Sequence, residues 1–148
     1  MRLAFNIFAI LGSAAFAGAM PTIGVTLGGY WKSLPPSEFL DWFGQNDKFI
    51  MRVIPLVVLP ALVGLGGSLW FDWQETAQRL LWAAATVCVL AVLALTIVWF
   101  VPANAAFASR SVTLDQVPER LNTWLILHGV RVGLALFGSA LGVLAVAK

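Results

Sequence analysis

The stretch RLNTWLILHGVR, from Arg120 to Arg131, carries two arginines and the chain's single histidine at the start of its last apolar run. On a helix advancing about 100° per residue, four side chains fall within an arc of about 80°: Arg120, Trp124, His128 and Arg131. An imidazole can accept a proton, a guanidinium can hold a phenolate or enolate oxygen, and an indole offers a flat face to an aromatic ring. We therefore predict a pocket wall with His128 as base and Arg131 as its electrostatic partner. Trp124 is predicted to bind substrate.

The depth of these residues in a membrane strengthens this interpretation. The following stretch, Val132 to Ala147, spans about 24 Å as a helix, which is less than the ~30 Å hydrocarbon core. His128 and Arg131 must then lie at or inside the hydrocarbon boundary, where ionisable groups cost at least ~2–3 kcal/mol each and normally face a bundle interior. The alternatives are a snorkelling role for Arg120 and a purely structural, hydrogen-bonded role for His128.

Three more side chains are candidates for the same pocket because of where their helices end. Asn104 lies at the exit of the third apolar run, Arg52 at the entry of the second, and Trp31 at the exit of the first. In an up-and-down bundle these ends lie on the same side as the start of the fourth run. We expect them to bind substrate together with Trp124. The sequence has no cluster of metal-ligating residues, so no metal site is expected.

The elements that position these residues are predicted to be membrane-spanning helices. The 148 residues are 60% hydrophobic and 11% charged, with a mean hydropathy of +0.89, which is outside the range of soluble domains. A span needs about 20 mostly apolar residues. Four stretches qualify: 3–29, 50–70, 78–102 and 120–147. The predicted fold is all-α, a four-transmembrane-helix bundle forming a single integral membrane domain over residues 1–148.

Short sequence patterns predict further features of the spans and of the loops between them. The longest loop, between the first two spans, predicts a short interfacial helix after Pro36, whose apolar side chains would lie close together: Phe39, Leu40, Trp42 and Phe43. Pro21 is expected to kink the first span, Pro55 and Pro60 are expected to bend the second, and Pro102 is expected to loosen the backbone at the end of the third. The sequence DWQE, from Asp72 to Glu75, has capping-box spacing for the start of the third span.

Charge and the N-terminal run bear on partners and location. The net charge is +2 with scattered Lys and Arg, so no nucleic-acid surface is expected. The expected partners are the lipid bilayer, a hydrophobic aromatic small molecule, and a membrane protein partner or a second copy of the chain in a homo-oligomer. The first apolar run continues past Pro21 and is longer than the apolar region of a signal peptide. We therefore expect a multi-pass protein of the bacterial inner membrane without a cleaved signal peptide.

A family resemblance rests on two short motifs. The pattern W-x-x-x-H-x-x-R from Trp124 to Arg131, preceded by P-x-N from Pro102 to Asn104 in a chain of four apolar spans, resembles the anthrone-oxygenase-like membrane proteins. The resemblance implies a four-helix membrane bundle and, for the fungal members, oxidation of an anthrone to an anthraquinone by oxygen without metal or flavin. It also implies His128 as base beside Arg131, with Trp124 and Asn104 lining the site. Bacterial members are largely of unknown function.

Two other functions stay open as alternatives to an oxygenase without a cofactor. A non-catalytic accessory or assembly subunit of a membrane complex would use the helix face that carries Arg120, Trp124, His128 and Arg131, here called the polar stripe, to contact a partner or a lipid head group. Short loops and abundant glycine suit that role. A cofactor binder would use His128 to ligate haem or to hydrogen-bond a quinone. Because one histidine cannot supply two axial ligands, haem would need an open position, Met20, Met51 or a second subunit.

Overall fold

The computed structural model describes the backbone of all 148 residues and the side chains of all but Ile50, Met51 and Val53. The all-α prediction is confirmed, because 88% of the residues are helical and the described chain contains no strand. Four helices are long and apolar enough to cross a membrane: Arg2–Ser33, Ile54–Phe71, Thr76–Ala108 and Val117–Val146. This is the layout of a multi-pass membrane protein.

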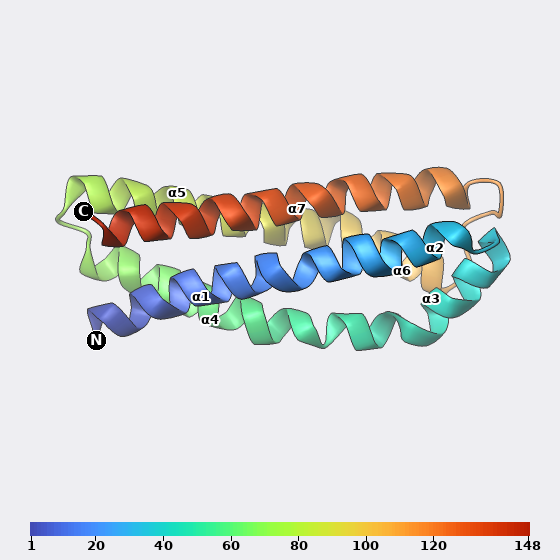
Figure 1. The fold of residues 1–148 in the computed structure, drawn as a ribbon, viewed down its shortest axis with the longest axis horizontal. Coiled ribbons are helices and arrows are strands. Elements are labelled where there is room, and N and C mark those ends of the chain that lie inside the picture. Colours follow the sequence, from blue (N-terminus) through green and yellow to red (C-terminus); the bar gives the residue numbers. More distant parts are fainter.

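The first and third of these helices are built from several segments each. The first comprises α1 (Arg2–Pro21), η1 (Thr22–Leu27) and α2 (Gly28–Ser33), and the third comprises α5 (Thr76–Leu95), η2 (Thr96–Phe100) and α6 (Val101–Ala108). The second is α4 (Val53–Phe71), preceded by α3 (Pro36–Met51), and the fourth is α7 (Val117–Val146). The four rods lie alongside one another with both termini at the same end, on the left of Figure 1.

The segments η1 and η2 are wide, π-helical turns that lie next to prolines. In η2 the Val101 N–H donates to the Thr96 carbonyl, five residues back, just before Pro102. A proline has no N–H, and its ring crowds the carbonyl four residues earlier, so a widened turn relieves the crowding. The first span has the same kind of turn directly after Pro21. The disturbance predicted at both prolines therefore takes the form of π turns.

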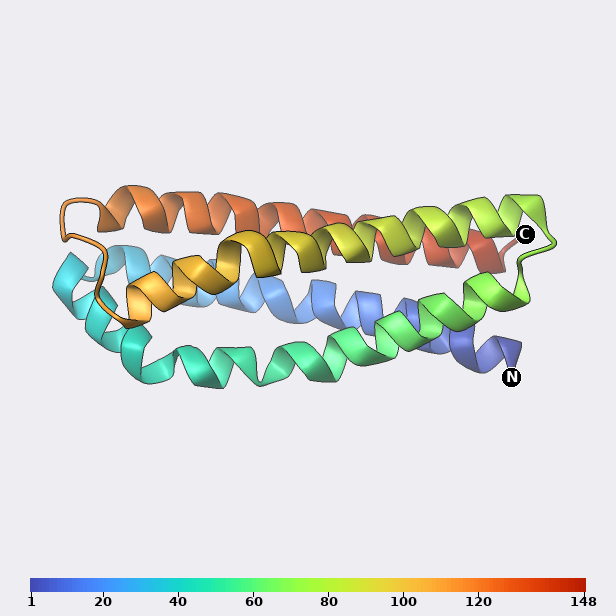
Figure 2. The ribbon, with the colours of Figure 1, turned by 180° about the vertical axis from the view of Figure 1, so that it is seen from behind.

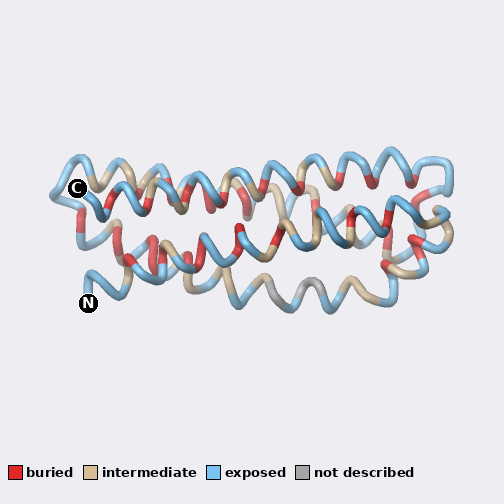
Figure 3. The backbone as a smooth tube through the Cα atoms, viewed as in Figure 1, coloured by how far each residue is buried: buried red, intermediate tan, exposed pale blue. Residues whose placement is uncertain are grey.

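Burial along α7 follows one face of the helix. Its buried residues recur every three or four positions: Val117, Leu121, Trp124, His128, Arg131, Ala135, Gly138, Gly142 and Ala145. This face packs against α5 and α1, and α1 in turn packs along α4. Figure 3 shows the buried positions turned inward between the rods and the exposed positions turned outward. The polar stripe predicted in the last span therefore faces the bundle interior, apart from Arg120, which is exposed.

The crossing of α1 and α4 depends on glycine. A Cβ atom built on Gly64 would lie 2.0 Å from the backbone nitrogen of Ala9, and one on Gly12 would lie 2.5 Å from that of Ala61. Neither neighbour can move aside easily, because both are backbone atoms of a facing helix. Close helix approach through small residues is a main source of packing energy in a membrane.

We predict that Gly64→Ala lowers the free energy of unfolding by about 1–3 kcal/mol, because the added methyl group forces α1 and α4 apart. The measurement is thermal unfolding in detergent, followed by circular dichroism. Gly66→Ala is the matched control, since a Cβ at Gly66 meets nothing within 4 Å. Equal stability of the two variants would contradict the close crossing.

The helix predicted between the first two spans is present as α3. It is longer than expected and leads into α4 through Arg52. Its residues Phe39, Leu40 and Phe43 are almost completely buried, and the ring of Phe39 lies 5.1 Å from that of Phe107 in α6. The apolar face of α3 therefore covers one end of the bundle.

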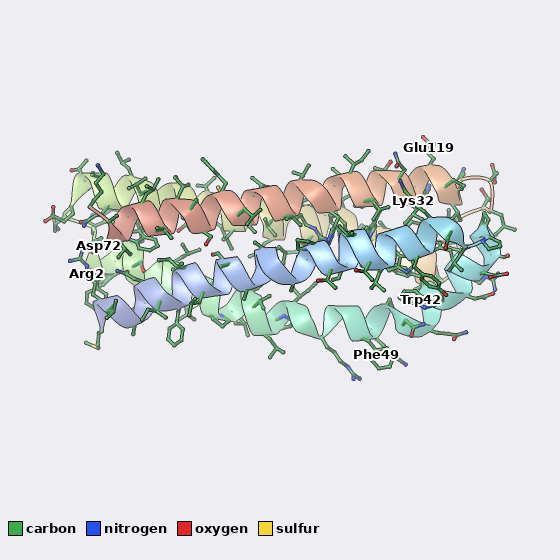
Figure 4. The ribbon with its side chains drawn as sticks, in the orientation of Figure 1. Arg2, Lys32, Trp42, Phe49, Asp72 and Glu119 are labelled. Carbon is green, nitrogen blue, oxygen red and sulfur yellow. The ribbon has the colours of Figure 1, made fainter. Side chains whose placement is uncertain are left out.

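The capping box predicted at Asp72 is wrong. Helix α5 starts after Glu75 without a side-chain cap, and Asp72 is instead a buried residue at the end of α4. Its carboxylate accepts a hydrogen bond from Trp82 Nε1 at 2.8 Å and pairs with Arg2 Nε at 2.7 Å. Figure 4 places Arg2 beside Asp72 at the end that carries both termini. Asp72 therefore makes a tertiary contact with the buried indole of Trp82 in place of the predicted local cap on α5.

Candidate functional site

A small cavity lies deep in the bundle, where the four spans meet. Its volume is about 20 Å³, enough for about one water molecule. The cavity is lined by Met20, Ile23, Ile54, Thr96, Phe100, Val101, Asn104, Trp124, His128 and Arg131. Four of the six predicted site residues are therefore brought together at this cavity: Asn104, Trp124, His128 and Arg131.

Both ring nitrogens of His128 are hydrogen-bonded. Nε2 lies 2.8 Å from the Met20 carbonyl oxygen, and Nδ1 lies 2.7 Å from Nη2 of Arg131. A carbonyl can only accept and a guanidinium can only donate, so Nε2 carries the proton and Nδ1 is the acceptor. The side chain is 2% exposed. His128 is therefore a buried neutral imidazole whose lone pair is held by Arg131.

Arg131 is a buried cation, 4% exposed, with no acidic partner among the described side chains. Its Nη1 donates to Thr96 Oγ1 at 3.2 Å, and its Cζ lies 3.3 Å from the centroid of the Phe100 ring. Its Nε has no hydrogen-bond partner among the residues that the structure describes. Buried charges are normally paired, because desolvation costs several kcal/mol per ion. Arg131 thus retains one buried donor, Nε, that no described protein group accepts from.

Trp124 fixes the plane of the imidazole. Its indole stacks on the His128 ring with centroids 4.9 Å apart and planes 11° from parallel. Its Nε1 donates to Asn104 Oδ1 at 2.8 Å, which satisfies the buried indole N–H. Asn104 therefore acts on the site through Trp124, in addition to lining the cavity.

Residues in and next to the two π turns form further walls of the site. In the first span, the Met20 carbonyl holds His128, and a Cβ built on Gly24 would lie 3.0 Å from the imidazole Cδ2. In the third span, η2 presents Thr96 and Phe100 to Arg131. Wide turns of this kind recur at functional sites because they re-aim side chains and free backbone groups.

Sequence reasoning missed these wall residues as members of the site. A phenylalanine, a glycine or a backbone carbonyl in an apolar span carries no polar signal. The nearby prolines Pro21 and Pro102 were the available signal, since they mark where the helices widen.

Two predicted site residues lie outside the cavity lining. The ring of Trp31 meets Trp124 edge-on at 5.4 Å, so it supports the site from one layer away. Arg52 is exposed, and its guanidinium lies 5.1 Å from the centroid of Phe49. Phe49 points away from the bundle in Figure 4. The connectivity placed both residues at the correct helix end, but Trp31 lies farther along the bundle axis than the cavity, and Arg52 is turned outward.

Met20 and Met51 were considered as haem ligands, and the structure describes the side chain of Met20 only. Met20 is 1% exposed and lines the cavity, and its carbonyl holds His128. The side chain of Met51 lies outside the described residues. Since both nitrogens of His128 are already hydrogen-bonded, ligation of a metal by His128 would require one of these bonds to break.

The chain matches a known protein family over most of its length. The family model described as anthrone oxygenase matches residues 42–141, which include Asn104, Trp124, His128 and Arg131. No curated protein and no solved structure matches the chain. The family match covers well over half of the sequence and all the cavity residues of the second, third and fourth spans. The chain therefore belongs to the anthrone oxygenase family.

Proposed function

We propose that this protein is a membrane oxygenase that oxidises a lipophilic, anthrone-like aromatic compound with molecular oxygen and needs no cofactor. One observation carries the proposal: the neutral imidazole of His128 is hydrogen-bonded to Arg131, a buried guanidinium without an acidic partner among the described side chains. This pair can remove a proton from a carbon acid and stabilise the resulting enolate oxygen. Membership in the anthrone oxygenase family supports the substrate class.

The first step is proton transfer from the activated methylene of the substrate to Nδ1 of His128. In the resting structure that nitrogen accepts a hydrogen bond from Arg131 Nη2. When the substrate oxygen binds the guanidinium, Arg131 turns toward it and Nδ1 becomes free to accept the proton. The imidazolium formed keeps its Nε2–H bond to the Met20 carbonyl. Stabilisation of the enolate oxygen is strong here because the buried site is shielded from bulk water.

Oxygen then reacts with the carbanion without an external reductant. The carbanion passes one electron to dioxygen, and the carbon radical and superoxide combine to form a C–O bond. The peroxide takes the proton held by His128. Loss of the second methylene proton with cleavage of the O–O bond gives the ketone and water. The balance is one anthrone plus one dioxygen to one anthraquinone plus one water.

The test is oxidation of anthrone by the purified protein in detergent, with simultaneous recording of anthraquinone absorbance and oxygen uptake. We expect one molecule of oxygen to be consumed for each anthraquinone formed, at a rate well above the protein-free autoxidation of anthrone. Arg120→Met is the control variant, because Arg120 lies exposed on the same helix outside the cavity. A rate no higher than autoxidation would refute the proposed activity.

A further inference from the structure

The cavity at His128 is closed toward the aqueous end of the bundle by aromatic side chains. This aromatic plug consists of six residues, each at most 3% exposed: Trp31, Phe39, Phe43, Phe100, Phe107 and Trp124. Its rings touch in a continuous series; for example, Phe100 lies 5.2 Å from Trp124, and Phe43 lies 5.4 Å from Phe107. The plug lies between the cavity and the end opposite the termini, where α2, α3, α6 and the start of α7 meet (Figure 1). A ligand arriving from water at that end would have to displace it.

Toward the other end, buried apolar side chains separate the cavity from the end of the bundle that carries the termini. Phe16, Ala17 and Val92 form a buried cluster with Ala135, the next buried residue of α7 after Arg131. The cavity is therefore closed along the bundle axis in both directions. A ligand path must run sideways between two helices.

One helix pair is loosely packed beside the cavity. Helix α4 packs along α1 and α5, but among the described residues it makes no more than isolated close approaches to η2 and α6. Figure 2 shows this side, with the first span visible behind, between α4 and the third-span rod. The cavity wall here consists of half-buried Ile54 and of Val101, which is 49% exposed. We call this line of loose contact the α4–η2 seam.

A second small cavity lies farther along the inward face of α4, where all four spans contribute to its lining. It also has a volume of about 20 Å³, and its lining is apolar apart from one serine: Ser13, Phe16, Val57, Val58, Ala61, Val89, Val92, Leu93 and Ala135. The two voids follow one another along the inward face of α4, so this helix loses few contacts when it moves away from the third span at the seam. Separation at the seam would enlarge the His128 cavity toward the lipid.

We infer that the ligand of the His128 cavity is an uncharged lipophile dissolved in the bilayer, and that it enters sideways through the α4–η2 seam past Ile54 and Val101. The inference rests on the proposed function in taking this cavity as the ligand site. The seam is apolar at its lipid-facing edge, so an ionised compound would lose its hydration there without compensation. The closed cavity holds about one water molecule, so a ring system requires the seam to open.

The single histidine of the chain provides a direct reporter that does not depend on turnover. The protein, prepared without a histidine tag and labelled with ¹⁵N-histidine, is reconstituted in phosphatidylcholine vesicles. The imidazole signals are then recorded by NMR with neutral 9,10-anthraquinone or with its ionised 2-sulfonate. Ile54→Trp narrows the seam, and Leu56→Trp is the matched control because Leu56 is 74% exposed and lies outside both cavities.

We expect neutral anthraquinone to change the His128 signals in the wild type and in Leu56→Trp. Ile54→Trp should lose this response while its probe-free spectrum matches the wild type, and the sulfonate should have no effect. A response to the sulfonate equal to that of the neutral compound, an Ile54→Trp response equal to that of Leu56→Trp, or no response to either probe would overturn the inference. Binding without oxidation would refute only the proposed activity. Oxidation at wild-type kcat/KM by Ile54→Trp would refute only ligand entry through the seam.

Discussion

Arg131→Met is expected to lower kcat/KM for anthrone oxidation by about 10²–10³-fold, the usual effect of removing a buried donor to a developing oxyanion. The same substitution should leave the protein at least as stable as the wild type. Arg131 is 4% exposed and has no acidic partner among the described side chains, so its desolvation penalty disappears with the charge. Methionine is unbranched and flexible enough to fill the space over the Phe100 ring.

The measurement for Arg131→Met combines steady-state kinetics with thermal unfolding in the same detergent. Arg131→Lys separates charge from geometry. Lysine keeps the charge but lacks the planar fork that reaches both Thr96 and His128, so we expect partial activity. Arg120→Met again serves as the surface control. Wild-type turnover in Arg131→Met would show that Arg131 does not stabilise the enolate oxygen, and a large loss of stability would show that Arg131 is mainly structural.

His128→Ala is expected to lower turnover by about 10²–10⁴-fold, the range for loss of a general base. The substitution leaves a slot bounded by the indole of Trp124, by Gly24 and by Arg131. Added imidazole can enter this slot and stack on Trp124. We therefore expect imidazole to restore part of the activity in a concentration-dependent manner.

His128→Phe is the matched control for this rescue, because its ring occupies the slot and carries no base. Both variants are compared by anthraquinone formation with and without imidazole, after circular dichroism has shown wild-type helix content. Rescue of His128→Ala alone would support proton transfer by this residue. Unchanged turnover in His128→Ala would exclude His128 from the reaction, and equal effects of imidazole on both variants would exclude rescue through the slot.

The polar stripe of the last span was predictable because two strong constraints coincide. Helix periodicity places Trp124, His128 and Arg131 on one face, and the cost of ionisable groups in hydrocarbon turns that face inward. The structure confirms that all three are buried and line one cavity. The roles of these residues in a reaction stay a prediction.

The partners of the stripe were less predictable, because they depend on contacts across helices. Connectivity placed Asn104, Arg52 and Trp31 at the same end of the bundle, yet only Asn104 lines the cavity. Helix ends follow from chain order, but the rotation of each helix about its axis and the level of each residue along the bundle follow from packing. The same applies to Asp72, where local capping spacing gave way to a buried bond with Trp82.

The sequence by itself determined that this chain forms four apolar helices with one inward-facing polar stripe, because span length, hydropathy and helix period are local properties of the chain. Only the tertiary structure decided what the stripe meets. Packing of the first span brings the Met20 carbonyl to His128, and the π turn before Pro102 presents Thr96 and Phe100 to Arg131. The reason is physical: the width of a turn and the approach of two helices are set by packing between segments far apart in the chain, which no local pattern encodes.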